Sequence, residues 1–229
     1  TFEHVMVPVD YASKYPYSAY GKMAATPETN FVDPLIALTA VAAGTKRVRL
    51  GTGVNILPQS NPLLLAKQAA SLDLVSDGRL MLGLGIGWLA EEFRAMGVPF
   101  EHRGARFDDY IAAMQKVWAG ELVEHRSRFL DWSGFKSHPL PVQKPFPVII
   151  GGSKGKAFER VARYGTGWYA PCESAEELAP LLAARGHRVV VPYLRGHGTT
   201  RFRSAETPRN GQPSVVAVDA RDGRALAVG

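Results

Sequence analysis

Three glycine-rich turns are the parts of this sequence best suited to bind a ligand. Each follows a short apolar run, and their glycines are Gly51 and Gly53, then Gly83, Gly85 and Gly87, then Gly151 and Gly152. Glycines at the ends of parallel strands let a ligand approach the backbone closely. The third turn continues through Ser153, Lys154 and Lys156 toward a helix predicted from Ala157. Because backbone N–H groups at a helix start bind anions, this turn predicts an anion site.

None of these turns matches a standard nucleotide-binding motif. Trp88 stands where the dinucleotide fingerprint needs a small residue, and the spacing from Gly152 to Lys156 is too short for a P-loop. Tight packing of strand ends explains Gly51 and Gly83 equally well. Residues 151–155 also spell G-x-S-x-G on a strand-to-helix turn, so a hydrolase with Ser153 as its nucleophile is an alternative interpretation.

Short apolar runs alternate with helix-period segments, which predicts a parallel α/β fold. We expect strands over 5–9, 48–54, 80–86, 148–150 and 168–170. Asp33-Pro34 and Asn61-Pro62 predict helix starts, because each puts a capping side chain before a proline. A further helix is expected over 105–119. The proline-rich residues 120–146 predict an insertion over the carboxyl ends of the strands.

Composition and charge restrict the protein class further. The chain has 229 residues, is 46% hydrophobic, and contains one cysteine, Cys172, which excludes a disulfide scaffold. Its longest apolar stretch is too short to cross a bilayer, so we expect a cytoplasmic protein with no membrane partner. The net charge of +6 is concentrated in residues 185–229, which hold eight arginines and three acidic residues. We expect neither a nucleic-acid partner nor a bound metal.

The order of several short motifs resembles the luciferase-like monooxygenase family, in particular its branch that uses the deazaflavin coenzyme F-420. The resemblance covers residues 1–183. It is carried by Phe2-Glu3-His4-Val5-Met6-Val7-Pro8, Arg49-Leu50-Gly51-Thr52-Gly53-Val54, Asp77-Gly78-Arg79-Leu80, Gly83-Leu84-Gly85-Ile86-Gly87-Trp88, Glu91-Glu92-Phe93, Arg103-Gly104 and Pro147-Val148-Ile149-Ile150-Gly151-Gly152. None of these motifs is specific by itself, whereas their order and spacing together are.

The resemblance implies a TIM barrel that binds coenzyme F-420, or alternatively FMN, and transfers a hydride to or from a small organic substrate. It places His4 at the ring face as the catalytic residue and as a cofactor contact. It implies a cis peptide at Gly53-Val54 that pushes against the back of the ring, with Gly85 and Gly87 beside the ring. It assigns the cofactor phosphate to Gly151, Gly152 and Ser153, and it implies a homodimer formed through residues 33–43 and 63–75.

Two departures from the family pattern leave alternatives open. Many deazaflavin members carry a carboxylate proton donor where this chain has Trp88, and Glu91 or Glu92 could replace it only one helical turn later. Residues 184–219 are similar to an α/β-hydrolase segment, which predicts a domain over 1–183 and a separate arginine-rich segment over 184–229. The chain thus resembles a partial (β/α)8 barrel that the second segment completes. An inactive remnant without cofactor is the alternative function.

Overall fold

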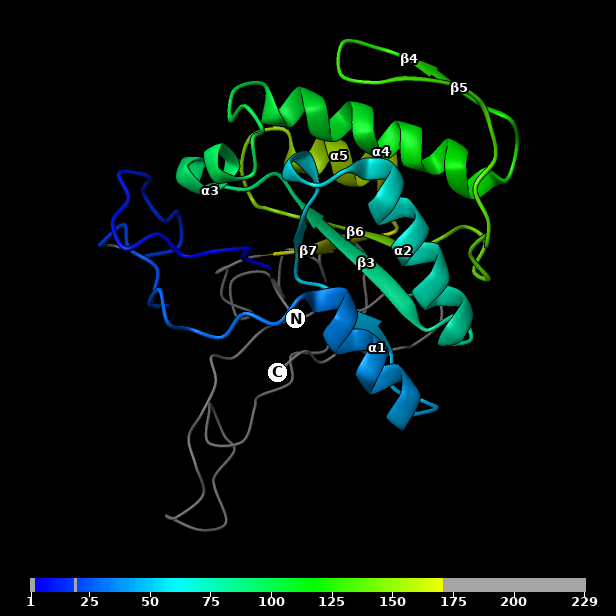
Figure 1. Cartoon of the computed structure of the whole chain (residues 1–229), viewed down its shortest axis with the longest axis horizontal. Helices are drawn as coiled ribbons and strands as arrows, with labels where there is room; N and C mark the ends of the chain where they lie inside the picture. The colour runs from blue at the N-terminus through cyan, green and yellow to red at the C-terminus, as the bar shows by residue number, and fades with distance from the viewer. Residues whose placement is uncertain (1–2, 19, 171–229) are drawn as a thin grey trace, which may run out of the picture. The chain divides into compact units, whose positions relative to one another are not determined.

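The computed structural model describes residues 3–18 and 20–170 (Figure 1). Residues 1–168 form one compact unit, and a second unit begins at Tyr169. The domain boundary that we predict at residue 183 and the arginine-rich segment over 184–229 lie outside the described residues. Everything below concerns the first unit.

A parallel sheet forms the centre of this unit. Its strands are β1 (Leu50–Gly51), β2 (Asn55–Ile56), β3 (Leu80–Gly85), β6 (Val148–Gly151) and β7 (Gly167–Tyr169). Both β1 and β2 pair with β3 in parallel, β6 pairs with the other edge of β3, and β7 lies next to β6. Since β3 is covered at both edges and on both faces, every one of its residues is buried. The predicted parallel α/β fold is confirmed.

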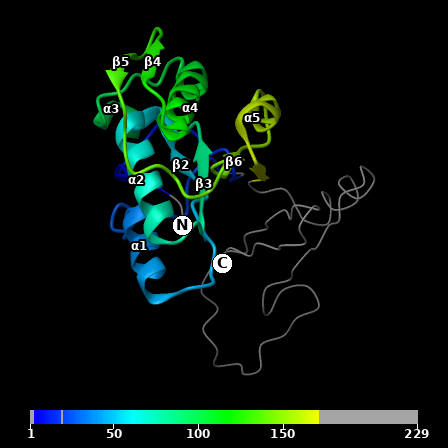
Figure 2. The same cartoon turned by 90° about the vertical axis from the view of Figure 1, so that its right-hand side faces the viewer.

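Helices pack against this sheet and against one another. The helices are α1 (Pro34–Gly44), α2 (Pro62–Val75), α3 (Ala90–Ala95), α4 (Arg103–Ala119) and α5 (Ala157–Tyr164), with a short 3-10 helix, η1 (Leu57–Gln59). Of the helices, α2 contacts β3 directly, α1 packs on α2 and β1, and α5 packs on β6. Leu80, Leu82 and Leu84 join the apolar core formed with α2 and α4. Figure 2 shows α1, α2 and α4 together on one side of β3 and α5 next to β6. Gly83 and Gly85 therefore face the opposite side, toward the interior of the curved sheet.

The predicted helix signals are confirmed by their hydrogen bonds. Asp33 accepts the N–H of Ile36 at 2.9 Å at the start of α1, and Asn61 accepts the N–H groups of Leu63 and Leu64 at the start of α2. At the end of α4, Gly120 takes the left-handed conformation with φ 82°, which ends the helix.

The predicted strand over 5–9 is wrong, and that over 48–54 is interrupted. Val5 and Val9 are exposed, and the side chain of Glu92, not a neighbouring strand, accepts the N–H of Val5 at 2.6 Å. An apolar run predicts burial, but burial depends on a covering element that the sequence does not show. Between β1 and β2 the chain leaves the ladder at the Gly53–Val54 peptide.

Residues 120–146 do not lie over the carboxyl ends of the strands, contrary to our expectation. They form a hairpin of β4 (Val123–Arg126) and β5 (Asp131–Phe135) followed by a loop. The buried carboxylate of Asp73 on α2 accepts the N–H groups of Val142 and Gln143 at 2.8 and 3.0 Å. The Gln143 amide donates to the carbonyl oxygen of Leu80 at the beginning of β3. Because α4 runs back toward the amino ends of the strands, the segment that follows it packs there.

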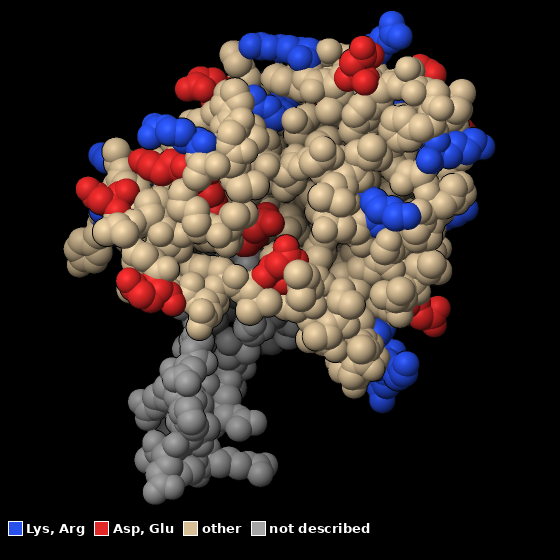
Figure 3. Space-filling model, in the orientation of Figure 1, with Lys and Arg blue, Asp and Glu red and all other residues tan. Residues whose placement is uncertain are grey.

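Charges are dispersed over the surface of the described residues. Figure 3 shows lysine and arginine side chains interspersed with aspartate and glutamate on one face, without a continuous basic patch. Among the helices of residues 3–18 and 20–170, none is both long enough and apolar enough to span a bilayer.

Candidate functional site

The Gly53–Val54 peptide is cis, as the sequence resemblance implies. It turns the Val54 side chain onto the two glycines that end β3 and β6. A Cβ atom built at Gly85 would lie 2.6 Å from Val54 Cγ2, and one built at Gly151 would lie 2.9 Å from Val54 Cγ1. The missing side chains of Gly85 and Gly151 therefore create the space in which Val54 lies. The three residues form a small apolar platform, which we call the Val54 platform.

We predict that Gly85→Ala destabilises the fold and that Val54→Ala restores most of the loss. The new methyl group overlaps Val54 Cγ2, and overpacking of this kind costs about 1–3 kcal/mol. Removing that Cγ2 atom leaves Val54 Cβ as the nearest atom, at an ordinary 3.7 Å. Urea unfolding of the two single variants and the double variant measures the coupling energy. Additive losses would show that Val54 does not occupy the space over Gly85.

The turn between β6 and α5 has the features of an anion site. Gly152 has φ 116°, a value that favours glycine, and only Ala157 Cβ lies within 4 Å of a Cβ atom built there. In the part of the chain that the structure describes, the backbone N–H groups of Ser153 and Lys154 donate to no other residue. The Gly152 carbonyl oxygen accepts the indole N–H of Trp168 at 2.7 Å, which holds the turn in place.

Helix α5 contacts α4 through a partly buried ion pair. Arg160 Nε lies 2.6 Å from Asp108 Oδ1, and Arg160 Nη2 also donates to the carbonyl oxygen of Gly104. This pair sets the position of the helix whose first turn follows Gly152 and Ser153. The residues predicted to bind phosphate are therefore presented by a rigidly anchored helix start.

His4 lies in a buried aromatic and acidic environment. Its side chain is only 8% exposed, and its Nδ1 lies 3.2 Å from Glu92 Oε2. The rings of Phe31 and Trp88 meet the imidazole edge to face, with centroids 5.4 and 5.9 Å away. Trp88 also contacts the rings of Tyr11 and Tyr15. Trp88 thus contacts both His4 and the loop that contains Tyr11 and Tyr15.

Glu3 and Glu91 are two further carboxylates in this part of the structure, and their pKa values shift in opposite directions. Burial by itself would raise the pKa of Glu91, but hydrogen bonds from the Ser13 hydroxyl and from the N–H groups of Ala12 and Ser13 lower it to about 2. Burial raises the pKa of Glu3 above its ordinary value, although the N–H of Ile56 donates to that carboxylate at 2.6 Å. Glu91 is therefore a poor replacement for the proton donor that Trp88 displaces.

The structure brings some of the predicted residues together and assigns others a packing role. Val54, Gly85 and Gly151 meet at one point, whereas Gly87 packs under Ile56 and Phe93 and accepts a hydrogen bond from Arg103. Sequence analysis named Glu92 only as a possible proton donor and missed it as the partner of His4. The sequence shows only that Glu92 follows Trp88 by one helical turn. It does not show the contact between Glu92 and His4, because these residues are 88 positions apart in the chain.

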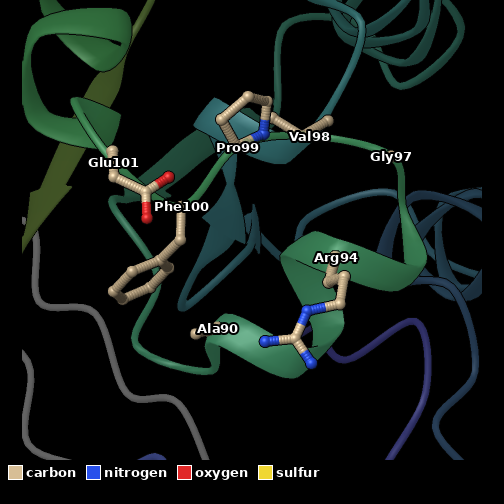
Figure 4. A pocket seen from close by; sticks show the side chains of 7 residues that line it. All are labelled: Ala90, Arg94, Gly97, Val98, Pro99, Phe100 and Glu101. Atoms are coloured by element: carbon tan, nitrogen blue, oxygen red, sulfur yellow. The ribbon is translucent and has the colours of Figure 1, made fainter.

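A surface pocket of about 360 Å³ lies elsewhere, between α3 and the loop that follows it (Figure 4). Figure 4 shows the Arg94 guanidinium and the Phe100 ring at its sides. None of the predicted site residues lines it; the lining residues are Ala90, Arg94, Gly97, Val98, Pro99, Phe100 and Glu101. Among the described residues, Ser153 has no hydrogen bond to a histidine, so nothing here supports its role as a hydrolytic nucleophile.

Comparisons with known proteins identify the family. Residues 2–228 match the luciferase-like monooxygenase family, so the match continues through the segment that we compared with α/β hydrolases. An uncharacterised protein of Mycobacterium tuberculosis is 34% identical over 181 residues, which are 79% of this chain and 62% of that protein. The oxygenase component of a flavin-dependent trigonelline monooxygenase from Acinetobacter baylyi is 35% identical over 119 residues, covering 51% and 33% of the two chains.

A solved structure agrees with this match. The monooxygenase RslO1 from Streptomyces bottropensis superposes with a TM-score of 0.59 and 32% identity, over 66% of this chain and 47% of that one. The chain spans about 60% of the length of the mycobacterial relatives. The parallel strands that end in glycine turns agree with the match over nearly the whole sequence. The chain belongs to the luciferase-like monooxygenase family.

Proposed function

We propose that this chain forms the cofactor-binding part of an oxidoreductase that uses a flavin or deazaflavin, either FMN or coenzyme F-420. The Val54 platform is apolar and has no side chain at two of its three residues, which suits the back of a planar ring. The N–H groups of Ser153 and Lys154, which have no partner among the described residues, suit a phosphate at the start of α5. These two features are the observations that carry the proposal, and the flavin-dependent relative of Acinetobacter baylyi supports it.

In this proposal each group of residues has a separate task. Val54, with Gly85 and Gly151 beneath it, supports the ring; Gly151, Gly152 and Ser153 hold the phosphate; His4 exchanges a proton beside the ring. A bound flavin or deazaflavin would supply the hydride-transfer or oxygen chemistry. The half-buried rings of Phe31 and Trp88 leave the His4 side chain only 8% exposed to water. A small organic substrate would bind on the same side.

Fluorescence titration of the purified full chain with FMN and, separately, with coenzyme F-420 tests the proposal. We expect saturable binding of one of them, and we expect Gly152→Asp to weaken it at least about 10-fold, because the new carboxylate repels a phosphate. The matched control is Gly134→Asp in β5. Gly134 also has a positive φ, 74°, so aspartate is strained at both positions, but no atom of the candidate site lies near it.

Either contrary outcome is informative. Equal weakening by the two variants would assign the effect to backbone strain and would remove the phosphate from the Gly152 turn. If the folded protein, shown by a cooperative thermal transition, binds neither compound, the glycine turns are structural and the chain is an inactive remnant of the family.

We also propose that a second copy of this chain covers the outer face of α1 and α2. Helix α1 contains no charged residue, and Ile36 on it is 68% exposed. On α2, Leu64 is 57% and Val75 is 66% exposed. Large exposed apolar side chains grouped in this way are typical of an interface. The molar mass of the full chain in solution decides whether this face forms a dimer.

A further inference from the structure

Glu92 is a carboxylate with almost no contact with water. It lies on α3 and is 2% exposed, although an ionised side chain is costly to bury unless it is hydrogen-bonded. Both of its oxygens have partners in the segment that contains His4. Oε1 accepts the N–H of Val5 at 2.6 Å and faces the N–H of Met6 at 3.4 Å, and Oε2 faces His4 Nδ1 at 3.2 Å. Glu92 therefore binds three consecutive residues.

These contacts restrict the protonation of the His4 ring. An ionised carboxylate only accepts hydrogen bonds, so in the ionised state of Glu92 the hydrogen shared with His4 lies on Nδ1. In a neutral imidazole the other nitrogen, Nε2, then carries a lone pair and no proton. Within residues 3–18 and 20–170, Nε2 of His4 makes no hydrogen bond. The rings of Phe31 and Trp88 stand edge to face with the imidazole, which limits its rotation.

We propose that Glu92 is a positioning residue that holds neutral His4 in the tautomer with the proton on Nδ1. Nε2 is then a proton acceptor. This inference rests on the proposed function in so far as His4 acts beside the cofactor. The tautomer itself is a property of the protein without cofactor, so it can be measured separately.

Nitrogen-15 NMR of the imidazoles in the cofactor-free full chain provides the test. The signals of His4 are those that disappear in His4→Gln. We expect the wild-type pattern to show a protonated Nδ1 and an unprotonated Nε2. The wild-type spectrum alone can overturn the proposal, because a proton on Nε2 in the neutral ring would mean that Nδ1 does not donate to Glu92.

The variant Glu92→Gln gives a second, independent result. The N–H groups of Val5 and Met6 need an acceptor, so the glutamine carbonyl oxygen should take the place of Oε1 and turn its NH2 group toward His4 Nδ1. Nδ1 then accepts a hydrogen bond, and the proton moves to Nε2. We expect the tautomer to invert. An unchanged tautomer in a variant that still unfolds cooperatively would contradict the proposal.

Glu91→Gln is the matched control for this experiment. Glu91 is the neighbouring glutamate on the same helix, but it accepts the N–H groups of Ala12 and Ser13 at 2.8 and 3.2 Å and does not contact His4. We expect the wild-type tautomer in this variant. The two proposals fail in different ways. If the wild-type chain has its proton on Nδ1 but binds neither FMN nor coenzyme F-420, the proposed function is refuted. If the wild-type chain binds one of them but has the proton on Nε2, the role of Glu92 is refuted.

Discussion

Replacement of Gly83 by alanine is expected to lower the free energy of unfolding by about 3 kcal/mol or more, at the upper end of overpacking effects. A Cβ atom at this position would lie 1.8 Å from the carbonyl oxygen of Thr52, which is backbone and cannot rotate away. The same two residues exchange hydrogen bonds. Thr52 Oγ1 accepts the N–H of Gly83 and donates to its carbonyl oxygen, both at 2.9 Å.

Gly51→Ala is the control, because Gly51 is also a strand glycine, the last residue of β1, which pairs with β3. The nearest atom to a Cβ there is Met81 Cε at 3.5 Å, the mobile end of a flexible side chain. We expect a loss below about 1 kcal/mol. Urea unfolding of both variants measures the difference. Similar losses would mean that β1 and β3 do not approach as closely as the structure shows, and that both glycines are interchangeable packing residues.

Replacement of Arg79 by methionine should destabilise the fold by about 3–5 kcal/mol, a value typical of disrupting a buried hydrogen-bonded charge network. The guanidinium is 9% exposed and donates to five acceptors. They are the carbonyl oxygens of Ser76, Val48, Ala42 and Thr45 and the hydroxyl of Thr45. No carboxylate is involved. Methionine would fill similar space but would leave these buried carbonyl groups without a donor.

The thermal unfolding midpoint is the appropriate measurement for this variant, and we expect it to fall by roughly 10 °C. Arg47→Met is the matched control. Arg47 lies on the connection between α1 and β1 that Arg79 binds, but it is exposed, so we expect a change within about 0.5 kcal/mol. A comparable fall in both variants would show that the loss of positive charge, not the loss of the hydrogen bonds, causes the effect.

Gly83 and Arg79 both belong to the family motifs, but the two predictions above assign them structural roles. Gly83 lets β3 approach the bend before Val54, and Arg79 fixes the end of α1 to the start of β3. The cofactor-binding proposal depends on both, because the Val54 platform is placed by β3. Substitutions at these positions should lower stability, whereas Gly152→Asp should lower cofactor binding.

The sequence by itself determined the parts of the fold that depend on local interactions. Asp33-Pro34, Asn61-Pro62 and Gly120 are confirmed as helix boundaries, because caps and left-handed glycines act within a few residues of the chain. The apolar run over 80–86 is confirmed as a buried strand, since a strand covered on both faces needs apolar side chains at every position. The motif order identified the family.

Tertiary structure decided whatever depends on contacts between distant segments. The run over 5–9 looks like a strand but lies exposed, and residues 120–146 pack at the opposite end of the sheet from the one predicted. Likewise, Glu92 pairs with His4 only because the end of β3 carries α3 back to the first segment. Side-chain patterns report local burial and conformation, whereas the position of one segment relative to another depends on how the whole chain packs.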